Sequence, residues 1–321
     1  MAPHRARRRR ARPSSGRRTV LYAVVASAVL VGGTAAGTVY VKAQAHDGGG
    51  LVSSSSAASG ASPTASEPTS GEASVEPVTE PSVDRTALLT KGMGAVTVPP
   101  GAKVSVAVLD LDSGESAAYG AGSFDTASIV KVDILATLLL QAQDADRRLT
   151  AQEKTYATAM ITDSDNASAS ALWDTIGQAH GLDAANDRFG LNGTAGGDGA
   201  LWGLTRTTAP DQLALLQQVF GDDSQLTEAS RTYLQGLMGE IAADQRWGVS
   251  AAADGSGWAL KNGWLPRSTT GLWDVNSIGR ITAAGHRYLV AALTDGNSTK
   301  AKGISLVEAA ARAAVSAFSA T

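Results

Sequence analysis

The chain has 321 residues but no cysteine, and it contains only four histidines. Without cysteine the protein can form no disulfide bond, use no thiol nucleophile and carry no cysteine-linked lipid. His4 and His46 precede the globular region, and neither His180 nor His286 lies near a nucleophile motif such as G-x-S-x-G. We therefore expect neither a Ser-His-Asp site nor a metal site, and no cofactor.

Positive charge is scarce outside the first 18 residues, which hold eight arginines and no acidic residue. The whole chain has 27 basic and 30 acidic residues, so the part after residue 18 has 19 basic residues against the same 30 acids, a net charge of −11. An acidic body lacks the basic face that a nucleic-acid-binding domain needs. We expect no nucleic acid among the partners.

An uncharged apolar run of 22 residues, 20–41, follows the basic segment 1–19. A positive segment before an apolar one is typical of an export signal or a membrane anchor, and this run is long enough to span a bilayer. Ala43-Gln44-Ala45 fits a cleavage site, and Arg17-Arg18 resembles a twin-arginine signal. We expect a single-pass cell-membrane protein with an extracytoplasmic C-terminal domain, or a secreted protein if cleavage follows Ala45.

Residues 42–84 are rich in Ser, Ala, Pro and Thr, so they cannot bury enough apolar area to fold and predict a disordered linker. From residue 85 the composition is that of a globular domain, which we expect to span 85–321. Apolar periodicity and capping residues locate its elements. The expected strands cover 103–111, 115–119, 258–264, 273–282 and 287–294, and the expected helices cover 128–143, 150–161, 167–180, 210–220, 227–243 and 305–318.

Strands at both ends of the domain enclose a helical middle. This order predicts a mixed α/β fold of the α+β type, in which one antiparallel sheet from both termini packs with helices, beside an all-helical subdomain. Residues 190–205, here called the glycine-rich segment, predict a loop without regular secondary structure. They lack the spacing of a phosphate-binding loop.

Three short motifs follow one another along the domain: Ser128-Ile129-Val130-Lys131, Ser164-Asp165-Asn166 and Lys261-Asn262-Gly263. Together they resemble the S-x-x-K, S-D-N and K-T-G set of penicillin-binding proteins and class A β-lactamases. The resemblance covers about residues 100–320. It implies the serine β-lactamase-like fold, whose layout is the one expected above.

Ser128 and Lys131 are one helical turn apart, so the lysine ammonium can approach the serine hydroxyl. A serine becomes a good nucleophile only when a base removes its proton, and a lysine is such a base only when its pKa is lowered. The apolar neighbours of Lys131 and a second charge from Lys261 both favour this shift. We therefore interpret Ser128 as the catalytic nucleophile and Lys131 as its base.

The second motif has two interpretations. In the family that the chain resembles, the serine relays a proton to the leaving group and the asparagine orients the substrate, which implies these roles for Ser164 and Asn166. Alternatively, Asp165 or Asn166 only caps the following helix.

The third motif lies on an expected strand, where Lys261 and Gly263 point to the same face. In the family, the lysine attracts a substrate carboxylate and the glycine lets the substrate lie against the strand edge. The middle residue, here Asn262, is usually a hydroxyl residue that binds carboxylate, and an asparagine can still donate a hydrogen bond. The resemblance also implies that the N–H of Trp264 forms an oxyanion hole with that of Ser128.

The chain departs from class A β-lactamases in the step that releases product. These enzymes carry a glutamate that activates water for deacylation, but no glutamate lies between Asn166 and Pro210. Asp198 is the nearest acid in the glycine-rich segment. The first two motifs are also closer together than in typical β-lactamases, which implies a trimmed helical region and an open cleft.

We expect a monomeric extracytoplasmic serine hydrolase that forms an acyl-enzyme on Ser128 with cell-wall peptide or β-lactam amides. Its partners are then a small-molecule or peptidoglycan-peptide substrate and, through the N-terminal segment, the membrane. Two alternatives stay open. One is a true β-lactamase in which Asp198 serves as the deacylating group, and the other is a non-catalytic cell-wall binding module that keeps the cleft.

Overall fold

The computed structural model of the chain describes residues 83–319. The basic segment 1–19, the apolar segment 20–41 and nearly all of the linker 42–84 lie outside these residues, so the predictions for them stay predictions. Within residues 83–319, no helix combines the length and the apolar character needed to cross a membrane.

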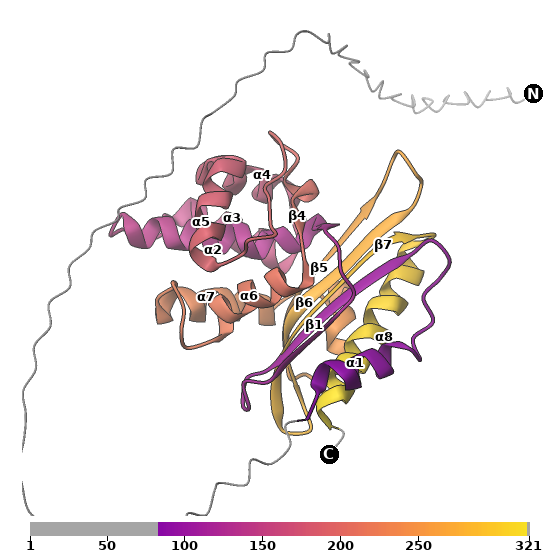
Figure 1. The fold of residues 1–321 in the computed structure, drawn as a ribbon. Coiled ribbons are helices and arrows are strands. Elements are labelled where there is room, and N and C mark those ends of the chain that lie inside the picture. Colours follow the sequence, from indigo (N-terminus) through magenta and orange to yellow (C-terminus); the bar gives the residue numbers. More distant parts are fainter. Residues whose placement is uncertain (1–82, 320–321) are drawn as a thin grey trace, which may run out of the picture. The chain divides into compact units, whose positions relative to one another are not determined.

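A five-stranded antiparallel sheet forms the centre of the domain (Figure 1). Its strands are β1 (Lys103–Asp110), β2 (Ser116–Tyr119), β5 (Trp258–Pro266), β6 (Trp273–Ala283) and β7 (His286–Asn297). They lie in the order β2-β1-β7-β6-β5, and β1 pairs with β7 over its whole length. This pairing joins the first strand of the domain to the last, which confirms the predicted sheet from both termini. β5 forms one edge of the sheet.

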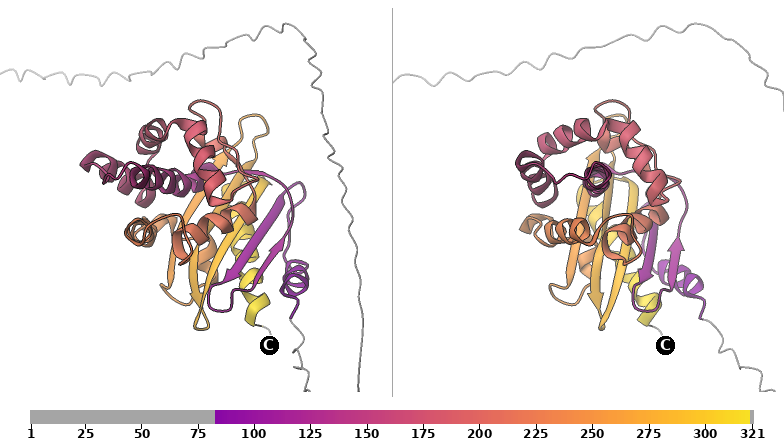
Figure 2. Two further views of the ribbon diagram at one scale, coloured as in Figure 1. Left: turned by 60° about the vertical axis from the view of Figure 1, so that its left-hand side comes forward. Right: turned by 90° about the vertical axis from the view of Figure 1, so that its left-hand side faces the viewer.

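Eight helices surround the sheet within the described residues. They are α1 (Arg85–Met93), α2 (Val130–Asp144), α3 (Ala151–Thr162), α4 (Asn166–Ile176), α5 (Gln178–Phe189), α6 (Ala209–Phe220), α7 (Glu228–Gly239) and α8 (Lys300–Ser319). α2 is buried on nearly all sides because its sequence is apolar all round. Figure 2 shows the helices α3 to α7 arranged around it.

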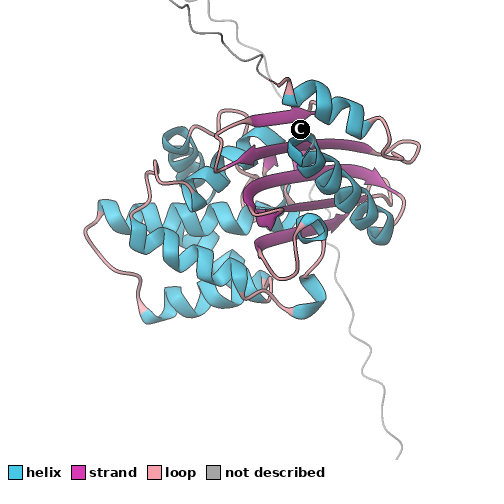
Figure 3. Ribbon diagram, turned by 90° about the horizontal axis from the view of Figure 1, so that it is seen from below, coloured by secondary structure: helices cyan, strands magenta, loops and turns pink. Residues whose placement is uncertain are grey.

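Two apolar cores lie on the two faces of the sheet. Along β1, Ala107 and Leu109 belong to the core with the central helices, whereas Val106 and Val108 belong to the core under α1 and α8. Successive side chains of a strand point to opposite faces, so a sheet covered on both faces is apolar at successive positions. Figure 3 shows α1 and α8 on one face and the remaining helices on the other.

Some helix boundaries differ from those expected. The helix predicted over 167–180 is two helices, because Gly177 adopts φ +89° after Ile176 and a new helix, α5, begins. Gly181, the expected stop, lies inside α5, where a Cβ would stand 1.7 Å from the backbone oxygen of Ile176. Its glycine is therefore needed for close packing. In contrast, the capping box predicted at Thr150 is present, with Glu153 as its partner.

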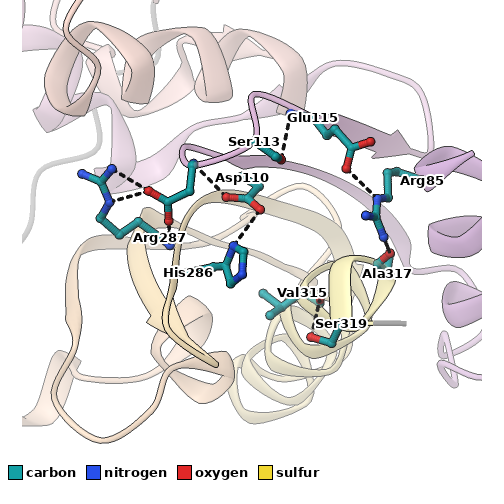
Figure 4. A network of polar contacts seen from close by, with 10 residues as sticks. Arg85, Asp110, Ser113, Glu115, His286, Arg287, Val315, Ala317 and Ser319 are labelled. Carbon is teal, nitrogen blue, oxygen red and sulfur yellow. Dashed lines mark hydrogen bonds and ion pairs between the residues drawn. The ribbon is translucent and has the colours of Figure 1, made fainter. Parts of the chain in front are cut away.

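A polar corner joins the end of β1 to the start of β7 (Figure 4). Nδ1 of His286 lies 3.1 Å from Oδ2 of Asp110, and Nη2 of Arg287 donates to Oδ1 of Asp112 over 2.6 Å. Asp110, Asp112 and His286 are close enough to share a cation, but the carboxylate of Asp112 is already paired with Arg287. We interpret this corner as a structural contact between strands.

Candidate active site

The backbone before Ser128 is held in a strained turn. Asn276 of β6 donates hydrogen bonds from Nδ2 to the backbone oxygens of Asp125 (2.9 Å) and Thr126 (3.1 Å). Ala127 then has φ +48°, a conformation that costs a residue with a side chain about 1–3 kcal/mol. Ala127 is the first residue of a 3₁₀ turn, Ala127–Ile129, which leads directly into α2. The turn therefore places Ser128 at the N-terminal end of the buried central helix.

Gly263 brings the edge strand β5 against this turn. A Cβ at Gly263 would lie 2.7 Å from the backbone nitrogen of Ser128 and 2.8 Å from the backbone oxygen of Thr126. Atoms at such distances overlap, so no other residue fits here without moving the backbone. The glycine of the third motif thus allows strand β5 to lie beside Ser128.

Two lysines meet at the hydroxyl of Ser164. Nζ of Lys131 donates to Oγ of Ser164 (3.1 Å), to its backbone oxygen (2.7 Å) and to Oδ1 of Asn166 (2.8 Å). Nζ of Lys261 donates to the same Oγ (3.0 Å) and to the backbone oxygen of Asn262 (2.9 Å). The structure therefore brings together residues of all three motifs, which lie far apart in the sequence.

Burial makes the protonated, charged form of both lysine side chains costly. Lys131 and Lys261 are fully buried. Desolvation lowers the pKa of Lys131 to about 7, although the nearby carboxylate of Asp165 opposes the shift. Desolvation, together with the charge of Lys131, lowers the pKa of Lys261 well below its ordinary value. A substantial fraction of Lys131 is therefore neutral near pH 7, which is the state that a general base requires.

Asp165 and Asn166 divide the two roles that the sequence left open. Asp165 caps α4, because its Oδ1 accepts the backbone N–H of Ser168 over 2.7 Å. Asn166 is the first residue of α4, and its side chain is exposed and holds Lys131. The capping interpretation therefore applies to Asp165, while Asn166 faces the site.

The side chain of Asn262 points away from Lys261 and Ser128, toward the backbone of residues 245–247. Its predicted contact with substrate therefore does not fit the structure. Only 1% of the residue is exposed, and its Nδ2 donates to the backbone oxygens of Gln245 (2.6 Å) and Trp247 (2.9 Å). Strand alternation places it on the face opposite Lys261 and Gly263. Asn262 supports the segment behind β5.

Trp264 borders the site, and its ring contacts Trp247 and Lys300. Its ring centroid lies 5.9 Å from that of Trp247 and 3.5 Å from Nζ of Lys300. Part of the residue still lines the cavity beside Ser128. The structure therefore keeps Trp264 at the predicted site, with its backbone next to Gly263.

A cavity of about 580 Å³ opens next to Ser128. Residues 200–204 at the end of the glycine-rich segment form one wall, and residues 264–269 after the middle of β5 form the other. Arg267 lies in the second wall, and none of the described residues that line the cavity is Asp or Glu. The cavity is therefore suited to an uncharged or anionic ligand.

Trp202 covers Lys131 from the first wall. The ring centroid of Trp202 lies 4.9 Å from Nζ of Lys131, and its Nε1 donates to Oγ of Ser170 over 3.1 Å. Nothing in the sequence singles out this tryptophan among the six, since it lies in a segment that predicts only an irregular excursion. Sequence reasoning also missed Asn276, because it is one of several polar residues in β6 and nothing local distinguishes it.

Asp198 does not reach this site. Its side chain is exposed, and it does not belong to the residues that line the cavity. The place above Lys131 is taken by the ring of Trp202. The geometry gives no support to Asp198 as a base beside Ser128.

Comparisons with known proteins agree with this fold. The model of the Beta-lactamase enzyme family matches residues 150–318, more than half of the chain. The chain belongs to this family. Its fold is the β-lactamase-like serine hydrolase fold, as the three motifs predicted.

Solved structures show the same fold at low sequence identity. PBP-A is 22% identical and has a TM-score of 0.63, over 74% of this chain and 97% of that one. The TLA-3 extended-spectrum β-lactamase is 14% identical, with a TM-score of 0.63 over 73% and 98% of the two chains. A β-lactamase of Xanthomonas campestris pv. campestris is 20% identical, with a TM-score of 0.58 over 73% and 97%.

Curated relatives include LppW of Mycobacterium tuberculosis and of Mycobacterium bovis, proteins named as lipoproteins. Each is 25% identical over an alignment of 178 positions, and the match covers 51% of this chain and 55% of the relative. The chain thus spans about half the length of the curated relatives it matches.

Proposed function

We propose that the protein is an extracytoplasmic serine hydrolase that forms an acyl-enzyme on Ser128 with cell-wall peptide or β-lactam amides. The observation that carries the proposal is the meeting of Lys131 and Lys261 at Oγ of Ser164, with Lys131 one helical turn from Ser128. A binding module has no need for two buried lysines with lowered pKa values, because burying them costs stability.

Acylation follows from these contacts. Neutral Lys131 accepts the proton of Ser128, and Oγ of Ser128 attacks the amide carbonyl carbon. The backbone N–H groups of Ser128 and Trp264 stabilise the oxyanion, since Gly263 allows the two segments to lie together. The C–N bond then breaks, and the leaving nitrogen takes the hydroxyl proton of Ser164, which Lys131 replaces.

Substrate position is set by the remaining groups. Lys261 is too buried to form a direct ion pair with the substrate. Its ammonium group, when protonated, lies at Oγ of Ser164 and attracts a substrate carboxylate that binds nearby. Asn166 is exposed next to Ser128 in the cavity lining and can accept or donate a hydrogen bond to a substrate amide. β5 is an edge strand, so an extended substrate can align along it.

Hydrolysis of the acyl-enzyme is expected to be slow. Among the described residues, no carboxylate lines the cavity to activate water, and the ring of Trp202 covers Lys131. One solved structure of a PBP-A mutant is an acyl-enzyme complex with penicillin G, so a protein of this fold can hold such an adduct. The alternative of a fast β-lactamase that uses Asp198 finds no support in the cavity.

The proposed location rests on the N-terminal sequence and on the relatives. The segment 20–41 has the length of a membrane anchor, and LppW is named as a lipoprotein. Because this chain has no cysteine, we propose that the apolar segment itself attaches it to the membrane, with the hydrolase domain on the extracytoplasmic side.

The test is the intact mass of the full chain in detergent after addition of benzylpenicillin. We expect one covalent adduct on the wild type and none on Ser128→Ala. Ser268→Ala is the matched control, because Ser268 is an exposed serine of the same cavity, and it should still be labelled. Labelling of Ser128→Ala would contradict the assignment. A wild type that forms no adduct and leaves penicillin intact would favour the non-catalytic binding module.

A further inference from the structure

The cavity beside Ser128 is the place for the acyl part of a substrate. Of the described residues, Ser128 and Asn166 line this cavity, whereas Ser164 and Lys261 do not. Under the proposed mechanism the leaving nitrogen takes its proton from Ser164, so the leaving part of the substrate lies toward Ser164 and Lys261. The acyl part then enters the cavity, between its first wall (200–204) and its second wall (264–269).

The carboxylate of Asp125 binds arginines from two directions. Asp125 belongs to β3 (Phe124–Asp125), three residues before Ser128, and it is buried. Nη1 of Arg206 donates to its Oδ1 over 3.0 Å, and Nη1 of Arg267 donates to its Oδ2. Each carboxylate oxygen therefore accepts one arginine, and the two ion pairs share a single buried acid.

The two arginines come from the two walls of the cavity. Arg206 starts β4 (Arg206–Thr207), two residues after the first wall, and lies opposite Asp125 in the pairing of β3 with β4. Arg267 belongs to the second wall. Its backbone oxygen accepts the N–H of Gly271 over 2.8 Å, so Arg267 also closes the loop that follows β5. Asp125 is therefore linked to both walls.

The other polar neighbours of the arginines hold one wall each. Nε of Arg206 donates to Oγ of Ser123 over 3.1 Å, and Nε of Arg267 lies 3.8 Å from Oδ2 of Asp274. Of the described side chains that pair with these arginines, that of Asp125 alone pairs with both. Hydrogen bonds between charged partners are strong and fix the geometry of the groups they join.

We propose that Asp125 is a positioning residue that holds the two walls around the acyl part of the substrate and so determines which acyl groups the enzyme accepts. This inference rests on the proposed function. Asp125 does not line the cavity, so it acts through the walls. Its own backbone oxygen accepts Nδ2 of Asn276 in β6 over 2.9 Å, and this contact fixes both walls to the central sheet.

The test compares acylation by two penicillins that differ only in the acyl group. Benzylpenicillin carries a phenylacetyl group that 6-aminopenicillanic acid lacks, and both have the same β-lactam ring and carboxylate. By intact mass of the full chain in detergent, Asp125→Asn should lower the acylation rate about tenfold with benzylpenicillin and less than about twofold with 6-aminopenicillanic acid. Asp112→Asn is the matched control, because it also removes a carboxylate that pairs with an arginine, and it should change neither rate.

An equal loss with both penicillins would overturn the proposal, because lower stability or a disturbed turn at Ser128 affects every substrate alike. Equal rates in Asp125→Asn and the wild type would overturn it as well. If Asp125→Asn fails to fold, Arg206→Gln takes its place, since Arg206 does not line the cavity. It should lower the rate with benzylpenicillin about threefold and leave that with 6-aminopenicillanic acid nearly unchanged.

Amide hydrogen exchange tests the walls without any acylation. The N–H of Leu204 donates to a backbone oxygen of the first wall over 2.8 Å, and that of Gly271 donates to one of the second wall over 2.8 Å. Asp125→Asn should speed the exchange of both amides at least about threefold, whereas Arg206→Gln should speed only that of Leu204. Unchanged exchange at both amides in Asp125→Asn would overturn the proposal.

The two measurements separate this inference from the proposed function. A wild type that forms no adduct with either penicillin would overturn the proposed function and the acyl-group selectivity with it. The exchange rates would then still decide whether Asp125 holds the two walls.

Discussion

Two regions beside Ser128 differ in their polar contacts: the cluster of Lys131, Ser164 and Lys261, here called the floor, and residues 200–204 of the cavity lining, here called the wall. On the floor, Lys131, Ser164 and Lys261 form a closed set of hydrogen bonds between 2.7 and 3.1 Å long. On the wall, Leu201 is 55% exposed and Trp202 presents an aromatic ring. Under the proposed mechanism the floor therefore supports formation of an acyl-enzyme, whereas the described residues of the wall include no carboxylate that would activate water to hydrolyse it.

This difference explains how one fold serves opposite outcomes. Acylation needs a nucleophile, a base and an oxyanion site, all of which come from rigid elements around α2 and β5. Deacylation adds one more requirement, a group that activates water. Under the proposed mechanism, the described wall of this protein lacks a carboxylate for that step, so the acyl group would be retained.

The largest effect is expected when the floor loses its base. Lys131→Met should lower the rate of adduct formation at pH 7 by about 10³-fold, because Ser128 then has no group to accept its proton. Stopped-flow or quenched intact-mass measurements with benzylpenicillin give this rate. Lys154→Met removes an exposed lysine of α3 and serves as the control. Unchanged acylation in Lys131→Met would assign the base to another residue.

A smaller loss is expected when the floor is kept but β5 is displaced. Gly263→Ala places a methyl group against the backbone of Ser128, so the oxyanion site opens and acylation should fall about 10²-fold. Gly236→Ala in α7 is the matched control, because no atom lies within 4 Å of a Cβ there. That control should acylate normally and gain about 0.5–1 kcal/mol of stability. Equal acylation in both variants would show that β5 can move without harm.

The sequence predicts the floor better than the wall, for a physical reason. The floor residues lie in short motifs whose spacing reflects one helical turn or strand alternation, so Ser128, Lys131 and Gly263 can be placed from local rules. Their meeting with Ser164 depends on the sheet order, which follows from strands at both ends of the domain.

Local rules do not predict the position of the wall, because tertiary contacts determine it. Trp202 lies over Lys131 through a hydrogen bond to Ser170 of α4, and no local period indicates that contact. The prediction for Asn262 is wrong for a related reason, since its motif position suggests a ligand contact while strand alternation directs it to the other face. The helix boundary at Gly177 is not predicted, because Gly181 is an equally good stop by local rules.

Removal of the aromatic wall should affect the second step and leave the first in place. Trp202→Ala lets water reach the ester of acylated Ser128, so we expect the adduct to hydrolyse about tenfold faster. The half-life of the adduct by intact mass measures this change. Trp202→Phe should keep the slow rate, and Leu201→Ala, in the same wall but exposed, should not alter it. A half-life independent of residue 202 would mean that the missing carboxylate alone makes hydrolysis slow.

The smallest expected effect is the pH dependence of the floor. Burial lowers the pKa of Lys131 to about 7, and only its neutral form can accept the proton of Ser128. The acylation rate should therefore rise with pH, by about fourfold between about pH 6.5 and 8.5, and then level off as the neutral form becomes complete. An ordinary lysine would give a rate that keeps rising about tenfold per pH unit across this interval. Asp165→Asn sharpens the test, because loss of the carboxylate that favours the ammonium should move the midpoint to lower pH.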